Sequence, residues 1–195
     1  MPERISEPQV KAALVKWLVQ QGAATIELSL DAMEGKHMRG AGANDFPEIL
    51  NKIGCVFEFT PKKASKGKVP SKFQGTYTFN QDGKKVTLEL THVAGVDVFA
   101  KLSDSSSIIA ECKGGPSPSA LATGGDLTSF YTCLGQLVIK AGLKSFETSR
   151  KMIVLPIFQR KSTTWHNEIK GNSMLKKMGI ELWFCDEKGI LIPVH

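Results

Sequence analysis

The stretch from Gly95 to Gly115 constrains the fold more than any other part of the chain, because it reads as two apolar strands joined by a polar turn. Apolar side chains lie in residues 96–99 and again in residues 108–110, and the residues between them are rich in Ser and Asp. The turn centres near Asp104, so a hairpin folded about that residue places Asp97 opposite Glu111. Facing residues of an antiparallel pair lie close enough to share a ligand. We therefore expect these two carboxylates to meet at the end of the hairpin.

The second strand of this hairpin carries its polar residues at its end. Side chains on a strand alternate between faces, so Lys113 projects beside Glu111 while Cys112 points to the other face. An ordinary cross-strand ion pair on a solvated face is one interpretation of this set. However, Ile108–Ala110 form a continuous apolar run, which is typical of a strand buried on both faces. Charges at the end of a buried strand need partners or a metal. Paired carboxylates suit Mg²⁺, and a lysine beside them can hold a phosphate or stabilise its transition state.

An Asp followed about a hairpin later by Glu-x-Lys resembles the active-site signature of the PD-(D/E)XK nuclease superfamily, which has the restriction-endonuclease-like fold. The Pro-Asp pair of that signature is Val96-Asp97 here, so the proline is absent and the carboxylate is present. The resemblance implies that Asp97 and Glu111 bind Mg²⁺, for which Mn²⁺ can substitute, with the carbonyl of Cys112 as a further oxygen ligand. It also implies that Lys113 is catalytic, either by polarising the attacking water or by stabilising the transition state.

Two further residues match positions that this superfamily often uses. Its nucleases often carry a Glu on the first helix that reaches the metal, and Glu7 matches by its order along the chain. A first-turn acid favoured by the helix dipole is the other interpretation of Glu7. A Gln near Gly-Gln-Leu recurs on the helix after Glu-x-Lys in several branches, and residues 135–137 match it. Those branches commonly have a tyrosine further on, where this chain has Lys140. Gln136 is therefore a catalytic residue by resemblance, or an amide that packs on the helix.

Basic residues indicate a polyanionic partner. The net charge is +6 and the sequence pI is about 9.1, which fits such a partner without establishing one. Residues 61–72 contain several lysines and no acid, interleaved with Pro, Ser and Gly. These lysines either contact phosphates or keep a strand edge soluble; we favour nucleic acid, because the positive charge is concentrated there. The candidate DNA-contacting residues are Lys62, Lys63, Lys66 and Lys68, with Arg160 and Lys161 after a later apolar strand.

The local patterns predict an α/β chain in the order helix, strands, helix, strand, helix and two strands. The first helix spans residues 5–22, with Ser6 as its N-cap and Pro8 in its first turn. Helices are also predicted at 46–53, 126–141 and 163–178. Besides the hairpin, strands are predicted at 24–30, 55–60, 75–80, 86–93, 152–158, 180–184 and 190–194. For the helix at 126–141 we expect Asp126 as its N-cap and a buried stripe of Phe130, Cys133, Leu134, Leu137 and Val138.

The resemblance turns this order into a specific fold expectation. It implies a restriction-endonuclease-like αβββαβ core, with a mixed central sheet flanked by helices and an inserted β-rich and loop region at residues 31–72. A chain of 195 residues is most simply one domain with room for a proper core.

Cysteine usage and hydropathy indicate a cytoplasmic protein. The four cysteines form no Cys-x-x-Cys pair and lie in apolar or structured stretches, so we expect reduced core thiols and no zinc site. The N-terminus lacks the apolar core of a signal peptide, and no apolar run is long enough to span a bilayer.

The sequence therefore predicts a metal-dependent endonuclease that hydrolyses phosphodiester bonds in DNA, and it leaves RNA open as another nucleic-acid partner. Restriction, repair and junction-resolving nucleases share this constellation of residues, and a homodimer would suit cleavage of both DNA strands. The alternative is a catalytically inactive protein of the same fold that binds nucleic acid or a protein partner. An intact set of two carboxylates and a lysine favours the enzyme, because a protein that only binds has little reason to retain all three.

Overall fold

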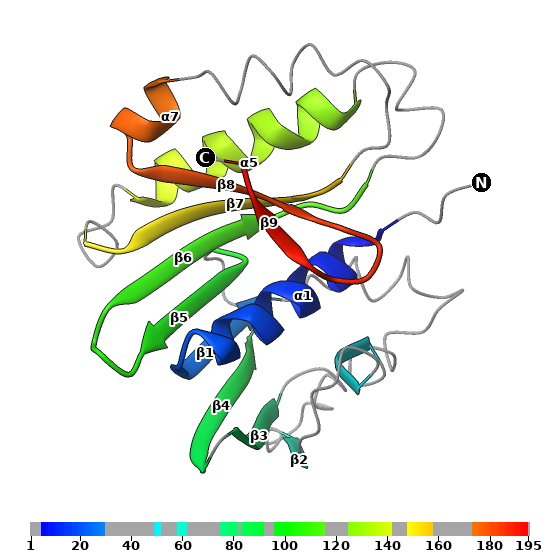
Figure 1. Cartoon of the computed structure of the whole chain (residues 1–195), viewed down its shortest axis with the longest axis vertical. Coiled ribbons are helices and arrows are strands. Elements are labelled where there is room, and N and C mark those ends of the chain that lie inside the picture. Colours follow the sequence, from blue (N-terminus) through cyan, green and yellow to red (C-terminus); the bar gives the residue numbers. More distant parts are fainter. Residues whose placement is uncertain are drawn as a thin grey trace, which may run out of the picture.

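A single mixed sheet with few helices forms the framework of the molecule (Figure 1). The computed structural model describes residues 5–29, 49–51, 58–61, 75–81, 83–91, 96–115, 125–141, 148–157 and 173–194. The helices are α1 (Glu7–Gln20), α5 (Gly125–Ala141) and α7 (Ser173–Lys177). The strands are β1 (Ala23–Ser29), β2 (Glu58–Pro61), β3 (Gly75–Gln81), β4 (Lys84–Thr91), β5 (Val98–Leu102), β6 (Ser107–Cys112), β7 (Arg150–Pro156), β8 (Ile180–Cys185) and β9 (Leu191–Pro193). These elements confirm the predicted α/β order.

The strands lie in the order β2-β3-β4-β1-β5-β6-β7-β8-β9. The strand β1 pairs in parallel with β4 and antiparallel with β5, so it lies between two strands that follow it much later in the chain. The strands β6, β7 and β8 are parallel, and each of the connections between them includes a helix. Parallel neighbours need such crossover connections, because a tight turn can join only antiparallel strands.

The central hairpin has the predicted register. In β5 and β6, Val98 pairs with Ala110, Phe99 with Ile109, and Ala100 with Ile108. Continued by one residue pair, this register places Asp97 opposite Glu111 at the open end of the hairpin, in agreement with the predicted position of the turn. The side chain of Asp104 accepts hydrogen bonds from the backbone and hydroxyl of Ser106, which stabilises the turn.

The start of α1 is fixed by a capping box. Ser6 is the N-cap as predicted; its hydroxyl accepts from the backbone N–H of Gln9, and the Gln9 side chain accepts from the backbone N–H of Ser6. The helix ends near Gly22, whose φ of 82° suits glycine. Because the cap defines the first turn, it also defines the position of Glu7.

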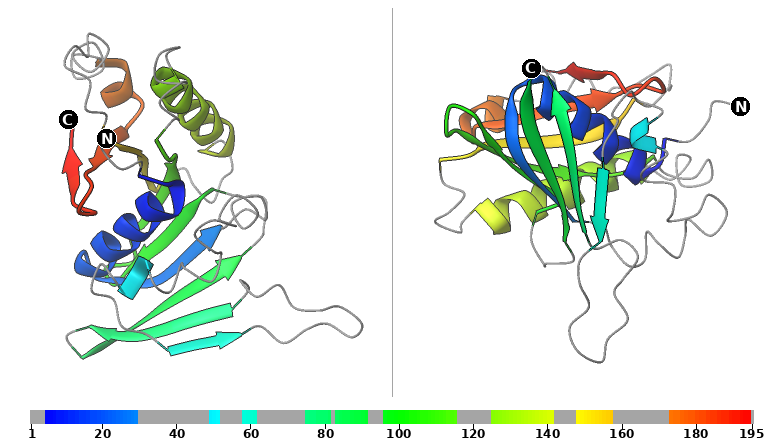
Figure 2. Two further views of the ribbon diagram at one scale, coloured as in Figure 1. Left: turned by 90° about the vertical axis from the view of Figure 1, so that its right-hand side faces the viewer. Right: turned by 90° about the horizontal axis from the view of Figure 1, so that it is seen from below.

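Helices cover both faces of the sheet, which twists strongly along its length (Figure 2). On one face, α1 packs against inward-facing residues of the strands, including Ile108, Ala110 and Cys112 of β6. On the other face, α5 and α7 pack against the alternate residues, such as Ile109 of β6 and Ile153 of β7. Residues 108–112 are all fully buried, so the predicted burial of this strand on both faces is confirmed.

Two details of α5 differ from the predictions, and the cysteines agree with them. The helix α5 begins at Gly125, so Asp126 lies within its first turn and is not the cap. Val138 was expected in the buried stripe but is 45 % exposed, because it lies on the outer side of α5. The described cysteines Cys112, Cys133 and Cys185 are buried and unpaired, which confirms the expected core thiols for these three.

The remaining helix predictions are only partly covered by the described residues. Of the helix expected at 163–178, only α7 lies within them; it ends at Lys177, and Gly179 follows with a φ of 64°. Residues 49–51 of the helix expected at 46–53 are helical. Among the described helices, none has the length and apolar character needed to cross a membrane.

Candidate active site

Asp97 lies at the open end of the hairpin and is held by the neighbouring strand. Its Oδ2 atom accepts a hydrogen bond of 2.8 Å from the backbone N–H of Cys112, across the β5–β6 pair. Burial raises the pKa of the Cys112 thiol well above its ordinary value, and this side chain packs in the α1-facing core. Cys112 therefore orients Asp97 through its backbone N–H, while its buried thiol lies in the core beneath the site.

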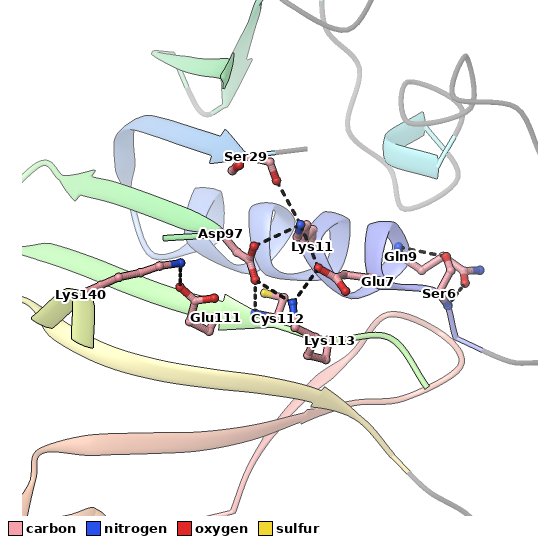
Figure 3. Close-up of polar contacts among 10 residues, drawn as sticks. All are labelled: Ser6, Glu7, Gln9, Lys11, Ser29, Asp97, Glu111, Cys112, Lys113 and Lys140. Atoms are coloured by element: carbon pink, nitrogen blue, oxygen red, sulfur yellow. Dashed lines mark hydrogen bonds and ion pairs between the residues drawn. The ribbon is translucent and has the colours of Figure 1, made fainter. Parts of the chain in front are cut away.

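Glu111 is a carboxylate buried at the end of β6. Its side chain is fully inaccessible, and Lys140 in the last turn of α5 donates to its Oε1 atom at 2.7 Å (Figure 3). The other oxygen, Oε2, is also buried, and it has no hydrogen-bond partner among the described residues. Burial, followed by the negative charge of Asp97, raises the pKa of Glu111 to about 7, although Lys140 opposes this shift. A buried carboxylate with one unpartnered oxygen is costly unless a proton or a cation completes it.

Lys113 extends away from Glu111 and toward α1. Its ammonium nitrogen lies 3.3 Å from Glu7 Oε1 and 3.8 Å from Asp97 Oδ2. Burial lowers the pKa of Lys113, but the charges of Asp97 and Glu7 raise it by more, so the net shift is upward. The side chain therefore remains a charged ammonium at neutral pH. The structure thus brings Lys113 to Asp97, whereas the sequence placed it beside Glu111.

A close approach of two backbones brings Glu7 into the site. The residue after Lys113 is Gly114, where a Cβ atom would lie 2.5 Å from the backbone nitrogen of Glu7. Next to it, the backbone N–H of Gly115 donates to the carbonyl of Ile5 at 2.8 Å. Only glycine permits this contact between the end of the Glu-x-Lys strand and the start of α1. The predicted first-helix acid therefore does reach the site.

Two lysines that sequence reasoning did not assign to the site complete it. Lys11 lies one turn after Glu7 on α1, and its ammonium contacts Glu7, Asp97 and the carbonyl of Ser29 (Figure 3). Lys140 is the counter-ion of Glu111. Each of these lysines lies three or four positions from a buried apolar residue of its helix, and so lies on the side of the helix that faces the core. A lysine at such a position is the sequence signal that could have assigned both residues to the site.

Gln136 lies on α5, one turn before Lys140. Its Oε1 atom is buried and has no hydrogen-bond partner within the part of the chain that the structure describes. Because residues four apart share a helix face, Gln136 and Lys140 point to the same side of α5. An unpartnered amide oxygen on that side is consistent with either of its predicted roles.

The Glu111 side of the site presents the kind of oxygen atoms that divalent cations prefer. The unpartnered Glu111 Oε2 and the adjacent Asp97 offer hard oxygen atoms, and the ordinary coordination of Mg²⁺ is completed by backbone oxygen and water. No group of three His, Cys, Asp or Glu side chains that could hold a metal occurs among the described residues. The two carboxylates that remain as possible donors are Asp97 and Glu111, because Glu7 is engaged by two lysines.

The candidate DNA-contacting residues Lys62, Lys63, Lys66, Lys68, Arg160 and Lys161 lie outside the described residues. Comparison of the chain with protein-family models, with curated proteins and with solved structures gives no match.

Proposed function

We propose that this chain is a metal-dependent deoxyribonuclease with a restriction-endonuclease-like core. The observation that carries the proposal is the buried carboxylate of Glu111 at the end of the central hairpin, one oxygen of which lies near Asp97 and has no hydrogen-bond partner in the described part of the chain. A chain gains no stability from such an arrangement, since an unsatisfied buried oxygen is unfavourable. A site that takes up a cation accounts for it.

The topology supports the proposed core. The elements α1, β1, β5, β6, α5 and β7 follow the order αβββαβ, and β1, β5, β6 and β7 are neighbours in the sheet. The strands β2, β3 and β4 extend the sheet beyond β1. On this assignment the added region runs from β2 to β4, so it continues past the inserted segment expected at residues 31–72.

The metal-binding residues are Asp97 and Glu111, with the backbone carbonyl of Cys112. A divalent cation bound there supplies Lewis-acid polarisation of the scissile phosphate and activates water for attack. The protein's own contribution is to hold both carboxylates in place. The backbone N–H of Cys112 orients Asp97. Lys140 orients Glu111 through Oε1, so that Oε2 is available to a cation.

The function of Lys113 is to stabilise negative charge on the phosphate as the transition state forms. Its raised pKa keeps it protonated, so it acts as a fixed positive charge and does not remove a proton from water. It is already placed by Glu7 and Asp97 before any substrate arrives. A preorganised charge of this kind needs no rearrangement during the reaction.

Asp97→Ala and Glu111→Ala should each abolish Mg²⁺- or Mn²⁺-dependent cleavage in a panel of linear, supercoiled, branched and single-stranded DNA, with RNA included. Lys113→Ala should lower the single-turnover rate far more than it lowers DNA affinity, measured with Ca²⁺ in place of Mg²⁺. The matched controls are the exposed residues of nearby strands, Glu89→Ala and Lys101→Ala. Near-wild-type cleavage by both carboxylate variants would show that Asp97 and Glu111 are not active-site residues.

A catalytically inactive nucleic-acid-binding protein is the second candidate, and the charge balance of the site favours it. Each of the three carboxylates in the site contacts at least one lysine, so no acid there lacks a counter-ion. Such a protein would bind DNA and cleave no nucleic acid with either metal. In that case Lys113→Ala would weaken affinity modestly, as the loss of one phosphate contact does.

A further inference from the structure

Lys11 is a buried ammonium at the centre of the site. Only 1 % of its surface is exposed, and lysine is almost never buried to this extent unless it is paired. Its nitrogen lies 3.1 Å from Glu7 Oε1, 3.4 Å from Asp97 Oδ1 and 3.0 Å from the carbonyl oxygen of Ser29. It therefore contacts α1, the start of β5 and the end of β1 together.

The carboxylates of Glu7 and Asp97 are both shared by the same two lysines. Lys11 contacts one Asp97 oxygen and Lys113 the other, while both contact Glu7 Oε1. The space between these two carboxylates is therefore already supplied with positive charge. By contrast, the described residues give Glu111 one lysine on Oε1 and no partner for Oε2.

We infer that Lys11 is a built-in cation, which holds Glu7 and Asp97 together in the place of a second divalent ion, so that the chain binds one divalent ion only, at the Glu111 side. The inference rests on the proposed function and specifies its cofactor requirement. It assigns Glu7 to the positioning of Lys11 and Lys113 and removes it from the metal ligands.

Electrostatics and hydration support this assignment. A divalent ion between Glu7 and Asp97 would lie close to two ammonium groups, and in a poorly solvated site that repulsion is strong. Magnesium also loses its water ligands reluctantly, which makes binding of a second ion less favourable. The ammonium of Lys11 is part of α1, so it is present in the site without a binding step. Since Lys11 is inaccessible, solvent cannot screen or replace it.

The test counts Mn²⁺ ions bound per chain by isothermal titration calorimetry, without nucleic acid. The wild type should bind one ion. Lys11→Met removes the ammonium and keeps a side chain of similar length, so it should bind two. The double variant Lys11→Met with Glu7→Gln should return to one, because the new site needs the Glu7 carboxylate. Lys16→Met, on the same helix and outside the site, is the matched control and should bind one.

The outcomes separate this inference from the proposed function. Two ions on the wild type, or one on Lys11→Met, would overturn the inference and leave the nuclease proposal standing. No ion on the wild type would overturn both. Should Lys11→Met fail to fold by circular dichroism, Glu7→Gln alone decides: a retained single ion supports the inference, and a lost one overturns it by making Glu7 a required ligand.

Discussion

Replacing Gly114 by alanine should separate α1 from the site. The added Cβ would meet the Glu7 nitrogen at 2.5 Å and the Ser6 carbonyl carbon at 3.0 Å, and both are backbone atoms that cannot rotate away. The two segments have to move apart by about 0.9 Å before the shorter contact reaches an ordinary 3.4 Å. This movement also strains the hydrogen bond from Gly115 to Ile5.

The expected cost follows from these two effects. Overpacking of this kind costs roughly 1 to 3 kcal/mol, and a weakened backbone hydrogen bond adds about 1 kcal/mol. We therefore expect Gly114→Ala to lower the free energy of unfolding by about 2 to 4 kcal/mol, which a domain of this size can survive. Cleavage should fall as well, because Glu7 no longer holds Lys113.

The assay is urea unfolding followed by tryptophan fluorescence, since Trp17 of α1 packs on Trp183 of β8 at 5.0 Å between ring centroids. The matched control is Gly135→Ala on α5, where a Cβ meets no atom within 4 Å. That change should stabilise the chain by up to about 1 kcal/mol, because alanine favours helix over glycine. Equal stability of Gly114→Ala and the wild type would refute the close approach that places Glu7.

Three further predictions concern charge. The pKa of Glu111 rises from 4.5 to about 7 on folding, so protonation of Glu111 stabilises the folded state. This contribution to the free energy of unfolding is complete below about pH 4.5 and is lost as the pH rises through about 7. It amounts to at most about 3 kcal/mol. Glu111→Gln should remove it, which unfolding at pH 5 and pH 8 without metal would detect as a smaller difference than in the wild type. Lys140→Met should destabilise the chain at pH 8 by roughly 2 kcal/mol, because Glu111 loses its counter-ion, while the exposed Lys176→Met should change little; equal effects would contradict the pairing. The third change neutralises four lysines together, Lys62, Lys63, Lys66 and Lys68. It should weaken DNA binding to a similar extent for all sequences, and the slope of log affinity against log salt should become shallower by up to about 0.9 per lost phosphate contact. An unchanged slope would mean that these lysines do not contact phosphates.

The hairpin and its register could be predicted from the sequence because their determinants are local. A polar turn with apolar runs on both sides fixes which residues face one another, and the pairing of Val98 with Ala110 follows from the position of Asp104. The N-cap at Ser6 was predictable for the same reason, since it depends only on the residues of one helical turn.

The positions of the site lysines depend on contacts between distant segments. Lys11 lies among apolar residues on the buried side of α1, but only the packing of α1 against β5 shows that its ammonium meets Asp97. The alternation of β6 correctly directed Glu111 and Cys112 to opposite faces, yet it could not show that Lys113 turns toward Glu7 beyond the strand end. The parallel pairing of β1 with β4 is likewise a long-range contact that no local pattern specifies.

The sheet order has a consequence for how the chain acquires its structure. The strand β1 is made early but has to wait for both of its neighbours, β4 and β5, and the pair of Glu7 with Lys113 spans 106 positions. Contacts between residues so far apart in the sequence form late in folding, because the entropic cost of closing the long loop comes before the contact stabilises it. During synthesis from the ribosome, the edge of β1 that pairs with β5 therefore remains unpaired until the hairpin emerges. A nascent chain stalled before β6 would leave the edge of β5 that pairs with β6 exposed, and it would lack both Glu111 and Lys113.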